Sequence, residues 1–330
     1  MSSNETTTMQ AITQDAYGNA DVLHLSEVSR PEAASNEVLL QVRAAGLDRG
    51  TWHLMAGLPY LMRPFVGFRG PRNPVPGLDV AGVVAAVGAD VTSFAVGDEV
   101  YGFGKGTFAE YAVAPADRLS RKPKNLSFEQ AAVVPVSAGT ALQALTQVGD
   151  VQPGQQVLVI GASGGVGSYA VQLAKARGAE VTGVCSPAKV DLVRSLGAQR
   201  VLDYTTEDWA DGTHHYDLVL DIGGRPTLSR LRRALTPAGT AVIVGGEDGG
   251  NLTGGMNRQL RAMALSPFVS QRLKSFVAGQ KASDLEQLTG FIEAGQVTPS
   301  LDRTYPLAEA PEAMHRLEAG AVRGKIAITP

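Results

Sequence analysis

The chain lacks the residues and segments that several classes of protein require. Of its 330 residues only Cys185 is a cysteine, which excludes an intrachain disulfide and a zinc cluster built from cysteines. No apolar run approaches the roughly 20 residues of a membrane-spanning helix, and the polar opening MSSNETTT is unlike a signal peptide. A formal net charge of −3 gives no electrostatic reason to expect nucleic acid or an anionic membrane as a partner. We expect a cytoplasmic protein.

The composition that is present, 44% hydrophobic and 18% charged, is that of a folded chain long enough for two domains. Segment 9–124 contains short apolar runs at 37–42, 79–87 and 108–113, separated by glycine and proline turns. This pattern predicts a β-rich barrel or sandwich. The residues SFEQ from Ser127 have capping-box spacing and predict the helix that introduces a second, α/β segment.

The most informative motif is VLVIGASGGVG at 157–167, an apolar strand that runs into four glycines within seven residues. A helical pattern follows over 166–177 and stops at Gly178, and another strand is predicted at 180–185. Such a strand, turn and helix places a pyrophosphate against the turn and the helix N-terminus. The motif therefore predicts a dinucleotide site, with a glycine-rich turn that binds nothing as the alternative.

Strands and helices then alternate until about Gly246. Strands are predicted at 200–204, 217–222 and 240–244, and helices at 189–196 and 227–235. This order predicts an α/β fold with a doubly wound parallel sheet whose strand exits face one ligand-binding crevice. Beyond it we expect helices at 284–293 and 308–318 and a strand at 325–329. Periodicity leaves open whether that strand joins the α/β sheet or the first domain.

Motifs along nearly the whole chain match one family at matching spacing: EVLLQVRAAG from Glu37, PGLDVAGVV from Pro76, GTFAEY from Gly106, SAGTA from Ser137, GASGGVG from Gly161 and RGKI from Arg323. With them the chain resembles the medium-chain dehydrogenase/reductase superfamily, in its zinc-free quinone-reductase-like branch. The resemblance implies a GroES-like catalytic domain over 1–126, a Rossmann domain over 127–266, and a C-terminal segment, 267–330, that returns to the catalytic domain. It also implies a homodimer.

The chain departs from the zinc-dependent members of that superfamily at the metal ligands. There a cysteine, a histidine and a second cysteine would fall at Asp48, Leu78 and near Val134. Leucine and valine cannot ligate zinc, and one carboxylate cannot supply three protein ligands. We therefore expect no metal and no metal-assisted alcohol oxidation.

The residues that follow the second predicted α/β strand indicate the cofactor. An NAD-selective site carries an acidic residue about 20 positions after the glycine loop, but here the chain reads CSPAK at 185–189. The resemblance implies that Ser186 and Lys189 hold the 2′-phosphate of NADPH, with Tyr204 beside the adenosine. A solvated lysine with slight selectivity is the alternative. The other expected cofactor contacts are Ser163, Gly164, Gly165, Val166, Gly167, Gly223, Val244, Gly245, Gly246 and Lys325.

Three side chains are candidates for the reaction itself. The resemblance places Asp48 and His53 on a loop that faces the nicotinamide, and His53 is the candidate donor of a proton or hydrogen bond. A packed histidine beside Trp52 is the alternative. Asp48 is ionised, protonated, or a turn residue that caps backbone amides, and the sequence leaves these open. Thr140, expected at a helix start, touches the nicotinamide end or acts as a cap.

Segment 54–68, LMAGLPYLMRPFVGF, is apolar but interrupted by glycine and proline, so we expect neither a regular helix nor a strand there. It is interpreted as the wall of a pocket for a quinone or an enone, or as a dimer contact, and 266–276 has the same two interpretations. The sequence thus predicts a zinc-independent, NADPH-dependent reductase of quinones or α,β-unsaturated carbonyls. An NADPH-binding regulatory or structural protein with negligible turnover is the alternative.

Overall fold

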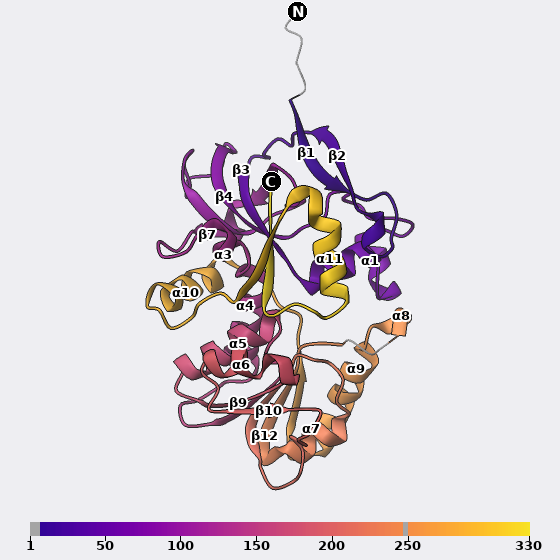
Figure 1. Ribbon diagram of the computed structural model, residues 1–330, viewed down its shortest axis with the longest axis vertical. Coiled ribbons are helices and arrows are strands. Elements are labelled where there is room, and N and C mark those ends of the chain that lie inside the picture. The colour runs from indigo at the N-terminus through magenta and orange to yellow at the C-terminus, as the bar shows by residue number, and fades with distance from the viewer. Residues whose placement is uncertain (1–6, 247–249) are drawn as a thin grey trace, which may run out of the picture.

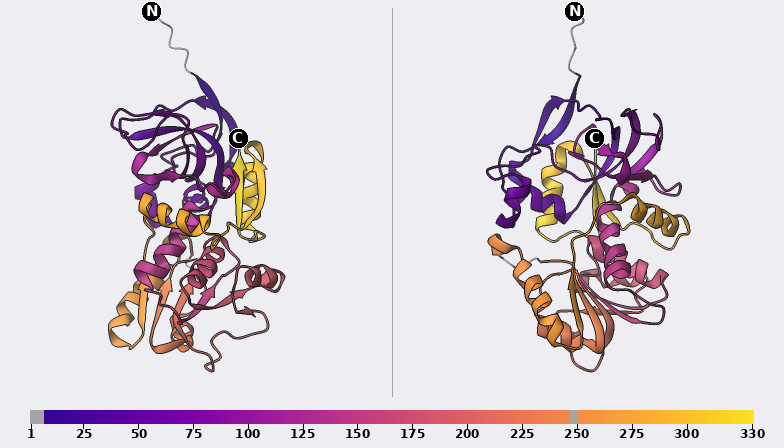
Figure 2. Two further views of the ribbon diagram at one scale, coloured as in Figure 1. Left: turned by 90° about the vertical axis from the view of Figure 1, so that its left-hand side faces the viewer. Right: turned by 180° about the vertical axis from the view of Figure 1, so that it is seen from behind.

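The computed structural model describes residues 7–246 and 250–330, which form two lobes (Figure 1). The upper lobe holds the N-terminal part of the chain together with its C-terminal end, and the lower lobe holds the middle of the chain. Both views in Figure 2 show the C-terminal segment, in yellow, against the upper lobe. Among the helices in these two ranges, none has the length and apolar character needed to cross a membrane.

The upper lobe is built on a seven-stranded sheet in the order β14-β15-β3-β4-β5-β7, with β6 paired to β3. Val38, Leu40 and Val42 alternate along β3 and pack into one buried core. The strands are β1 (Thr8–Thr13) and β2 (His24–Ser29), which pair separately, and β3 (Glu37–Leu47), β4 (Asp79–Val87), β5 (Glu99–Phe103), β6 (Tyr111–Pro115), β7 (Leu119–Arg121), β14 (Leu301–Pro306) and β15 (Lys325–Thr329). The predicted β-rich domain is confirmed.

The lower lobe is a six-stranded parallel sheet in the order β10-β9-β8-β11-β12-β13. Alternate residues of β8 enter different cores, Val157 and Val159 on one face and Leu158 and Ile160 on the other, because helices cover both faces. The strands are β8 (Gln156–Ile160), β9 (Glu180–Cys185), β10 (Arg200–Asp203), β11 (Tyr216–Asp221), β12 (Leu235–Ile243) and β13 (Arg272–Ser275). The doubly wound sheet is confirmed, but its predicted end near Gly246 is wrong because β13 adds an edge strand.

In the lower lobe helices alternate with strands as predicted, and the described residues form helices in both lobes. They are α1 (Arg49–Ala56), α2 (Arg63–Val66), α3 (Phe128–Ala132), α4 (Pro135–Gln143), α5 (Gly165–Ala176), α6 (Val190–Ser195), α7 (Leu228–Ala234), α8 (Gly250–Thr253), α9 (Met256–Leu265), α10 (Ala282–Glu293) and α11 (Ala310–Glu318). The capping box is present at α3, where the Ser127 hydroxyl accepts from the Gln130 amide and the Gln130 side chain accepts from the Ser127 amide.

Strand β15 settles the question that periodicity left open. It pairs with β3 and β14, so the C-terminal strand belongs to the upper lobe. The segment with Asp48 and His53, expected as a loop that faces the nicotinamide, is a helix instead. Asp48 caps α1, which contains His53 and extends to Ala56. The expectation of no regular helix over 54–68 is therefore wrong at its start, and short helical turns occupy Tyr60–Met62 and Arg63–Val66.

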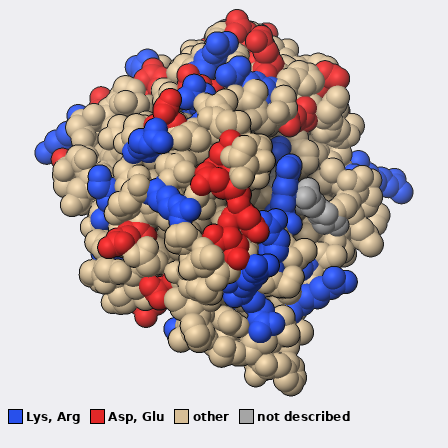
Figure 3. Space-filling model, turned by 60° about the horizontal axis from the view of Figure 1, so that its bottom comes forward, with Lys and Arg blue, Asp and Glu red and all other residues tan. Residues whose placement is uncertain are grey.

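The surface of the lower lobe carries charges of both signs. Figure 3 shows a band of Lys and Arg side chains beside Asp and Glu, without a broad field of one sign. Arg230 pairs with Asp208 at 2.6 Å on this lobe, and Arg194 pairs with Asp191 at 3.0 Å. Such exposed pairs add at most about 1 kcal/mol each to stability, so the lobe depends on its apolar cores.

Candidate cofactor and active site

A cavity of about 490 Å³ lies between the lobes, where the carboxyl ends of β8, β11 and β12 meet α1, α4 and the start of β15. It is at the edge of the parallel sheet where such folds bind ligands. The predicted residues that line it are Asp48, His53, Thr140, Ser163, Gly164, Gly165, Val166, Lys189, Gly223, Val244, Gly245, Gly246 and Lys325. Gly167, Ser186 and Tyr204 were predicted as well but do not line it.

The glycine loop presents bare backbone to this cavity. Gly161 turns the chain at a φ of 86°, and α5 begins at Gly165 after the N-cap Gly164, which has no side chain to cap the helix. The first amides of a helix attract anions, and no side chain satisfies them here. A Cβ added at Gly164 would meet only the Gly161 carbonyl, at 3.4 Å, so its missing side chain leaves space on the cavity side. The loop fits the pyrophosphate of a dinucleotide.

Gly167 serves packing within the loop. A Cβ there would lie 2.1 Å from the Gly161 carbonyl oxygen and 2.8 Å from the Ala162 Cα. Helix α5 therefore approaches its own turn more closely than any other residue type allows. The sequence prediction had assigned this glycine to cofactor contact, whereas the structure shows a contact of chain with chain.

Lys189 stands at the end of the cavity where adenosine was expected. Its ammonium donates to the Val322 carbonyl at 2.7 Å and the Gly320 carbonyl at 3.2 Å, and so joins the lower lobe to the upper lobe. Burial lowers the pKa of this lysine. An ammonium has three donors, so one remains beyond these two carbonyls. Tyr204 is 57% exposed, and its amide donates to the Cys185 carbonyl beside Ser186.

The opposite end of the cavity contains the three predicted reaction residues. Asp48 Oδ1 accepts from the Thr51 amide at 2.8 Å, which confirms the capping alternative. His53 Nδ1 lies 3.0 Å from the Leu58 carbonyl oxygen, and because that oxygen only accepts, Nδ1 carries the proton. His53 also packs edge-on against Trp52, with 4.9 Å between ring centroids.

Thr140 lines the cavity from inside helix α4. Its hydroxyl donates to the Val136 carbonyl at 2.6 Å, one turn earlier in the helix. The expectation of a capping residue at a helix start is wrong, because α4 begins at Pro135. The helix presents the Thr140 oxygen, as an acceptor, to the cavity.

Asp79 and Lys325 form a buried pair that sequence reasoning did not recognise as such. The Lys325 ammonium lies 3.7 Å from Asp79 Oδ2, and the two side chains are 2% and 0% exposed. Burial raises the pKa of Asp79 well above its usual range, while the Lys325 charge opposes that rise. The available signal was an aspartate inside the apolar run PGLDVAGVV.

Arg258 is a second cation that the sequence reading missed, and its side chain is 15% exposed. It donates to Asp221 Oδ2 at 2.5 Å, to the Pro226 carbonyl at 2.8 Å and to the Gly245 carbonyl at 2.8 Å. Burial raises the pKa of Asp221, and Arg258 lowers it again. Helix α9 thereby fixes the exits of β11 and β12, which supply Gly223 and Gly245 to the cavity.

The segments predicted as a pocket wall lie elsewhere. No residue of 54–68 or 266–276 lines this cavity, so that interpretation is wrong for it. Phe65 and Phe68 are 73% and 76% exposed. The segment does reach the lower lobe, because α8 packs on the turn Tyr60–Met62.

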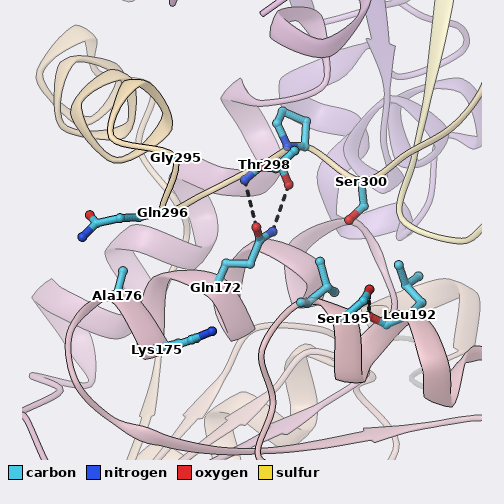
Figure 4. A pocket seen from close by; sticks show the side chains of 11 residues that line it. Gln172, Lys175, Ala176, Leu192, Ser195, Gly295, Gln296, Thr298 and Ser300 are labelled. Carbon is cyan, nitrogen blue, oxygen red and sulfur yellow. Dashed lines mark hydrogen bonds between the residues drawn. The ribbon is translucent and has the colours of Figure 1, made fainter. Parts of the chain in front are cut away.

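Another hollow, of about 630 Å³, lies between α5, α6 and residues 295–300 (Figure 4). There the Gln172 amide accepts from the Thr298 amide at 2.8 Å and donates to the Thr298 carbonyl at 3.0 Å. These bonds attach the returning chain to α5. The Gln172 side chain makes its hydrogen bonds within the protein, so we interpret this hollow as the contact between α5 and residues 295–300 and not as a ligand site.

Two family models match parts of this chain. The family model described as the alcohol dehydrogenase GroES-like domain matches residues 34–124, and the one described as zinc-binding dehydrogenase matches residues 196–328. The first match lies in the upper lobe, and the second runs from the lower lobe into the C-terminal strands of the upper lobe.

Curated relatives match over almost the full length. The mouse mitochondrial protein named NAD(P)H oxidoreductase RTN4IP1 is 32% identical over 99% of this chain and 90% of its own. A chloroplastic quinone-oxidoreductase homolog from Spinacia oleracea is 33% identical over 98% of both chains. The 2-methylene-furan-3-one reductase of Solanum lycopersicum is 33% identical over 98% of this chain and 79% of its own.

Among solved structures, mycobacterial Rv1454c complexed with NADPH superposes with a TM-score of 0.83 and 27% identity, over 98% of this chain and 100% of that chain. This likeness and the full-length relatives agree with the glycine loop, the two-lobed fold and the cavity between the lobes. The chain therefore belongs to the medium-chain dehydrogenase/reductase superfamily, as a quinone oxidoreductase-like member that uses a nicotinamide cofactor.

Proposed function

We propose that this protein is a zinc-independent, NADPH-dependent reductase of quinones or α,β-unsaturated carbonyls. The observation that carries the proposal is the cavity itself, which has an uncapped helix N-terminus in the middle and a lysine at the end expected for adenosine. The names of the spinach and tomato relatives supply the two acceptor classes.

Lys189 supports NADPH over NADH. Its third donor is available for a 2′-phosphate, and the first acidic residue after the strand exit is Asp191, whose side chain pairs with Arg194. A charge-assisted hydrogen bond is worth about 1.5 to 3 kcal/mol, which corresponds to a preference of roughly tenfold to a hundredfold.

Zinc-independence rests on the chemistry of the donors. Leu78 and Val134 carry no ligating atom, and Asp48 already caps α1. Within 7–246 and 250–330, no group of three or more His, Cys, Asp or Glu side chains is arranged to hold a metal ion.

The chain's own residues have three tasks in such a reaction. The amides at the start of α5 bind the phosphates, and Leu47, Val136, Ile222 and Val244 give the cavity apolar walls that exclude water. The bound nicotinamide supplies the hydride. Protein groups then stabilise and protonate the oxygen anion that forms on the acceptor.

The test is a panel of quinones and enones mixed with the protein and NADPH, followed by NADPH absorbance. We expect consumption with at least one acceptor class, a slower rate with NADH, and no change when a zinc chelator is added. Tight NADPH binding without consumption on any acceptor would contradict the proposal and favour a regulatory binding protein.

We also propose that the protein forms a homodimer in the cytoplasm. Exposed apolar side chains on and just after α9, Leu260, Met263 and Phe268, support association, because such a surface is costly in water. Light scattering on the purified protein tests the dimer, and a monomeric mass at micromolar concentration would refute it.

A further inference from the structure

A buried group of charges lies at the reaction end of the cavity, and its hydrogen bonds are incomplete. Among the described residues, Lys325 Nζ, Asp79 Oδ2 and Asp48 Oδ2 are buried atoms without a hydrogen-bond partner. The 3.7 Å between Lys325 and Asp79 is an ion-pair distance, too long for a hydrogen bond. Buried charges are costly unless they are paired, so a lysine left with unused donors here calls for a function.

The backbone holds Lys325 firmly in this place. It is the first residue of β15, and its amide donates to the Ser300 carbonyl at 2.8 Å. Its stem crosses the glycine loop, where a Cβ added at Gly165 would lie 3.1 Å from Lys325 Cδ. Lys325 thus lines the cavity beside the phosphate-binding turn, and its ammonium faces Asp79.

Asp79 is fixed as firmly from the other side. Its Oδ1 accepts from the Val136 amide at the start of α4, at 2.9 Å. A Cβ at Gly46, on the paired strand, would lie 2.9 Å from the Asp79 Cβ, so glycine leaves the room that this carboxyl occupies. The pair Asp79–Lys325 is therefore set by the fold before any ligand binds.

The other side chains at this end are poor proton donors as placed. The Nδ1 proton of His53 is used on the Leu58 carbonyl, and the hydroxyl proton of Thr140 is used on the Val136 carbonyl. An ionised Asp48 would repel an oxygen anion. Of the two lysines that line the cavity, Lys189 donates to two carbonyls at the adenosine end, whereas the Lys325 ammonium lies at this end without a hydrogen-bond partner.

We propose that the Lys325 ammonium is the group that protonates the reduced acceptor, with Asp79 as the residue that positions it. This inference rests on the proposed function. An enone takes up a hydride at its β-carbon while the nicotinamide is oxidised, and the electron pair moves to the carbonyl oxygen. The resulting enolate accepts one proton from Lys325, whose neutral amine then regains a proton from water. A quinone is converted to its hydroquinone by the same two transfers.

The decisive variant is Lys325→Met, compared with Lys124→Met at an exposed lysine outside the cavity. We expect Lys325→Met to bind NADPH in calorimetry as the wild type does, but to lose about a hundredfold or more in kcat, the usual contribution of a proton donor. Lys124→Met should keep both. Loss of NADPH affinity with kcat unchanged at saturation would overturn the inference and make Lys325 a cofactor-binding residue.

A second readout does not depend on turnover. We expect para-nitrophenol, added with NADP⁺, to bind the wild type and Asp79→Asn as the phenolate, whose absorbance differs from that of the phenol. In Lys325→Met it should bind as the phenol. If the single variant does not fold, Lys325→Met/Asp79→Asn removes both charges and replaces it. If Lys325→Met binds the phenolate and keeps its full kcat, the inference is overturned while the reductase function stands. If the wild type reduces no acceptor, the proposed function itself is refuted.

Discussion

The two ends of the cavity differ in burial and in the separation of their residues along the chain. At the adenosine end, Lys189 lines the cavity, and Ser186 and Tyr204 lie outside its lining, after the neighbouring strands β9 and β10; all three are exposed or half-buried. At the reaction end, Asp48 and Lys325 line the cavity, and Asp79 pairs with Lys325; the three come from distant parts of the chain and are almost fully buried. Solvent screens the charges at the first end, whereas desolvation dominates at the second. We therefore expect substitutions at the exposed end to change affinity and those in the buried part to change stability.

The largest expected effect is in the buried part, for Arg258→Met. The substitution leaves Asp221 buried without its cation, which should cost about 3 to 5 kcal/mol in the free energy of unfolding. Urea unfolding measures it, with Arg261→Met, an exposed arginine on the same helix, as the matched control. If Arg258→Met and Arg261→Met lose the same small amount of unfolding free energy, burial does not distinguish these two arginines.

The pH dependence of that loss has a definite sign. Burial raises the pKa of folded Asp221, so the carboxyl favours the folded state most below its unfolded-state pKa, and this contribution disappears as pH rises through the folded pKa. Without Arg258 the folded pKa rises further. The difference between wild type and variant should therefore grow from acid to neutral pH. A difference that is constant over this range would show that the lost carbonyl contacts dominate.

Two glycines of the glycine loop, Gly164 and Gly167, separate effects on stability from effects on cofactor affinity. Gly167→Ala places a Cβ 2.1 Å from a backbone oxygen, and we expect a loss of roughly 3 kcal/mol in unfolding free energy. Gly164→Ala meets nothing closer than 3.4 Å, so its melting temperature should hold while its NADPH affinity falls. Calorimetry and thermal unfolding of both variants check this. Equal melting temperatures would refute the packing role of Gly167.

At the exposed end, Lys189→Glu should weaken NADPH binding by roughly tenfold to a hundredfold, the value of about 1.5 to 3 kcal/mol for a charge-assisted bond. Binding of NADH should not change, because it has no 2′-phosphate. Titration with both cofactors decides. Equal weakening of both would mean that Lys189 acts through Gly320 and Val322 and not through a phosphate.

The smallest effect is expected for Tyr204→Ala. Its ring is 57% exposed, so removing it should leave unfolding unchanged and cost about 0.5 to 1.5 kcal/mol of cofactor binding through a lost stacking contact. Fluorescence titration with NADPH measures this. A larger loss would show that the adenosine end closes around the cofactor more tightly than its exposure implies.

The sequence determined what local patterns encode. The apolar strand and glycines at 157–167 predicted the turn, the helix and the cavity edge, and the capping box at Ser127 predicted α3, because these features depend on near neighbours. The edge strand β13 was missed because it has only four residues, RLKS, and a single buried apolar side chain, which is too short a pattern to predict a strand. Thr140 was misplaced within its helix because Pro135, which starts the helix, gave a boundary that was not recognised.

Only the tertiary structure decided which buried charges are paired beside the cavity. Asp79 and Lys325 are far apart along the chain, and they meet because β15 returns to pair with β3 in the upper lobe. Arg258 reaches Asp221 for a similar reason, through the packing of α9 against the sheet. Periodicity in the sequence indicates which face of an element is buried, but long-range packing decides which residue pairs with a buried charge. Removing that partner is costly because the remaining charge stays buried and unpaired.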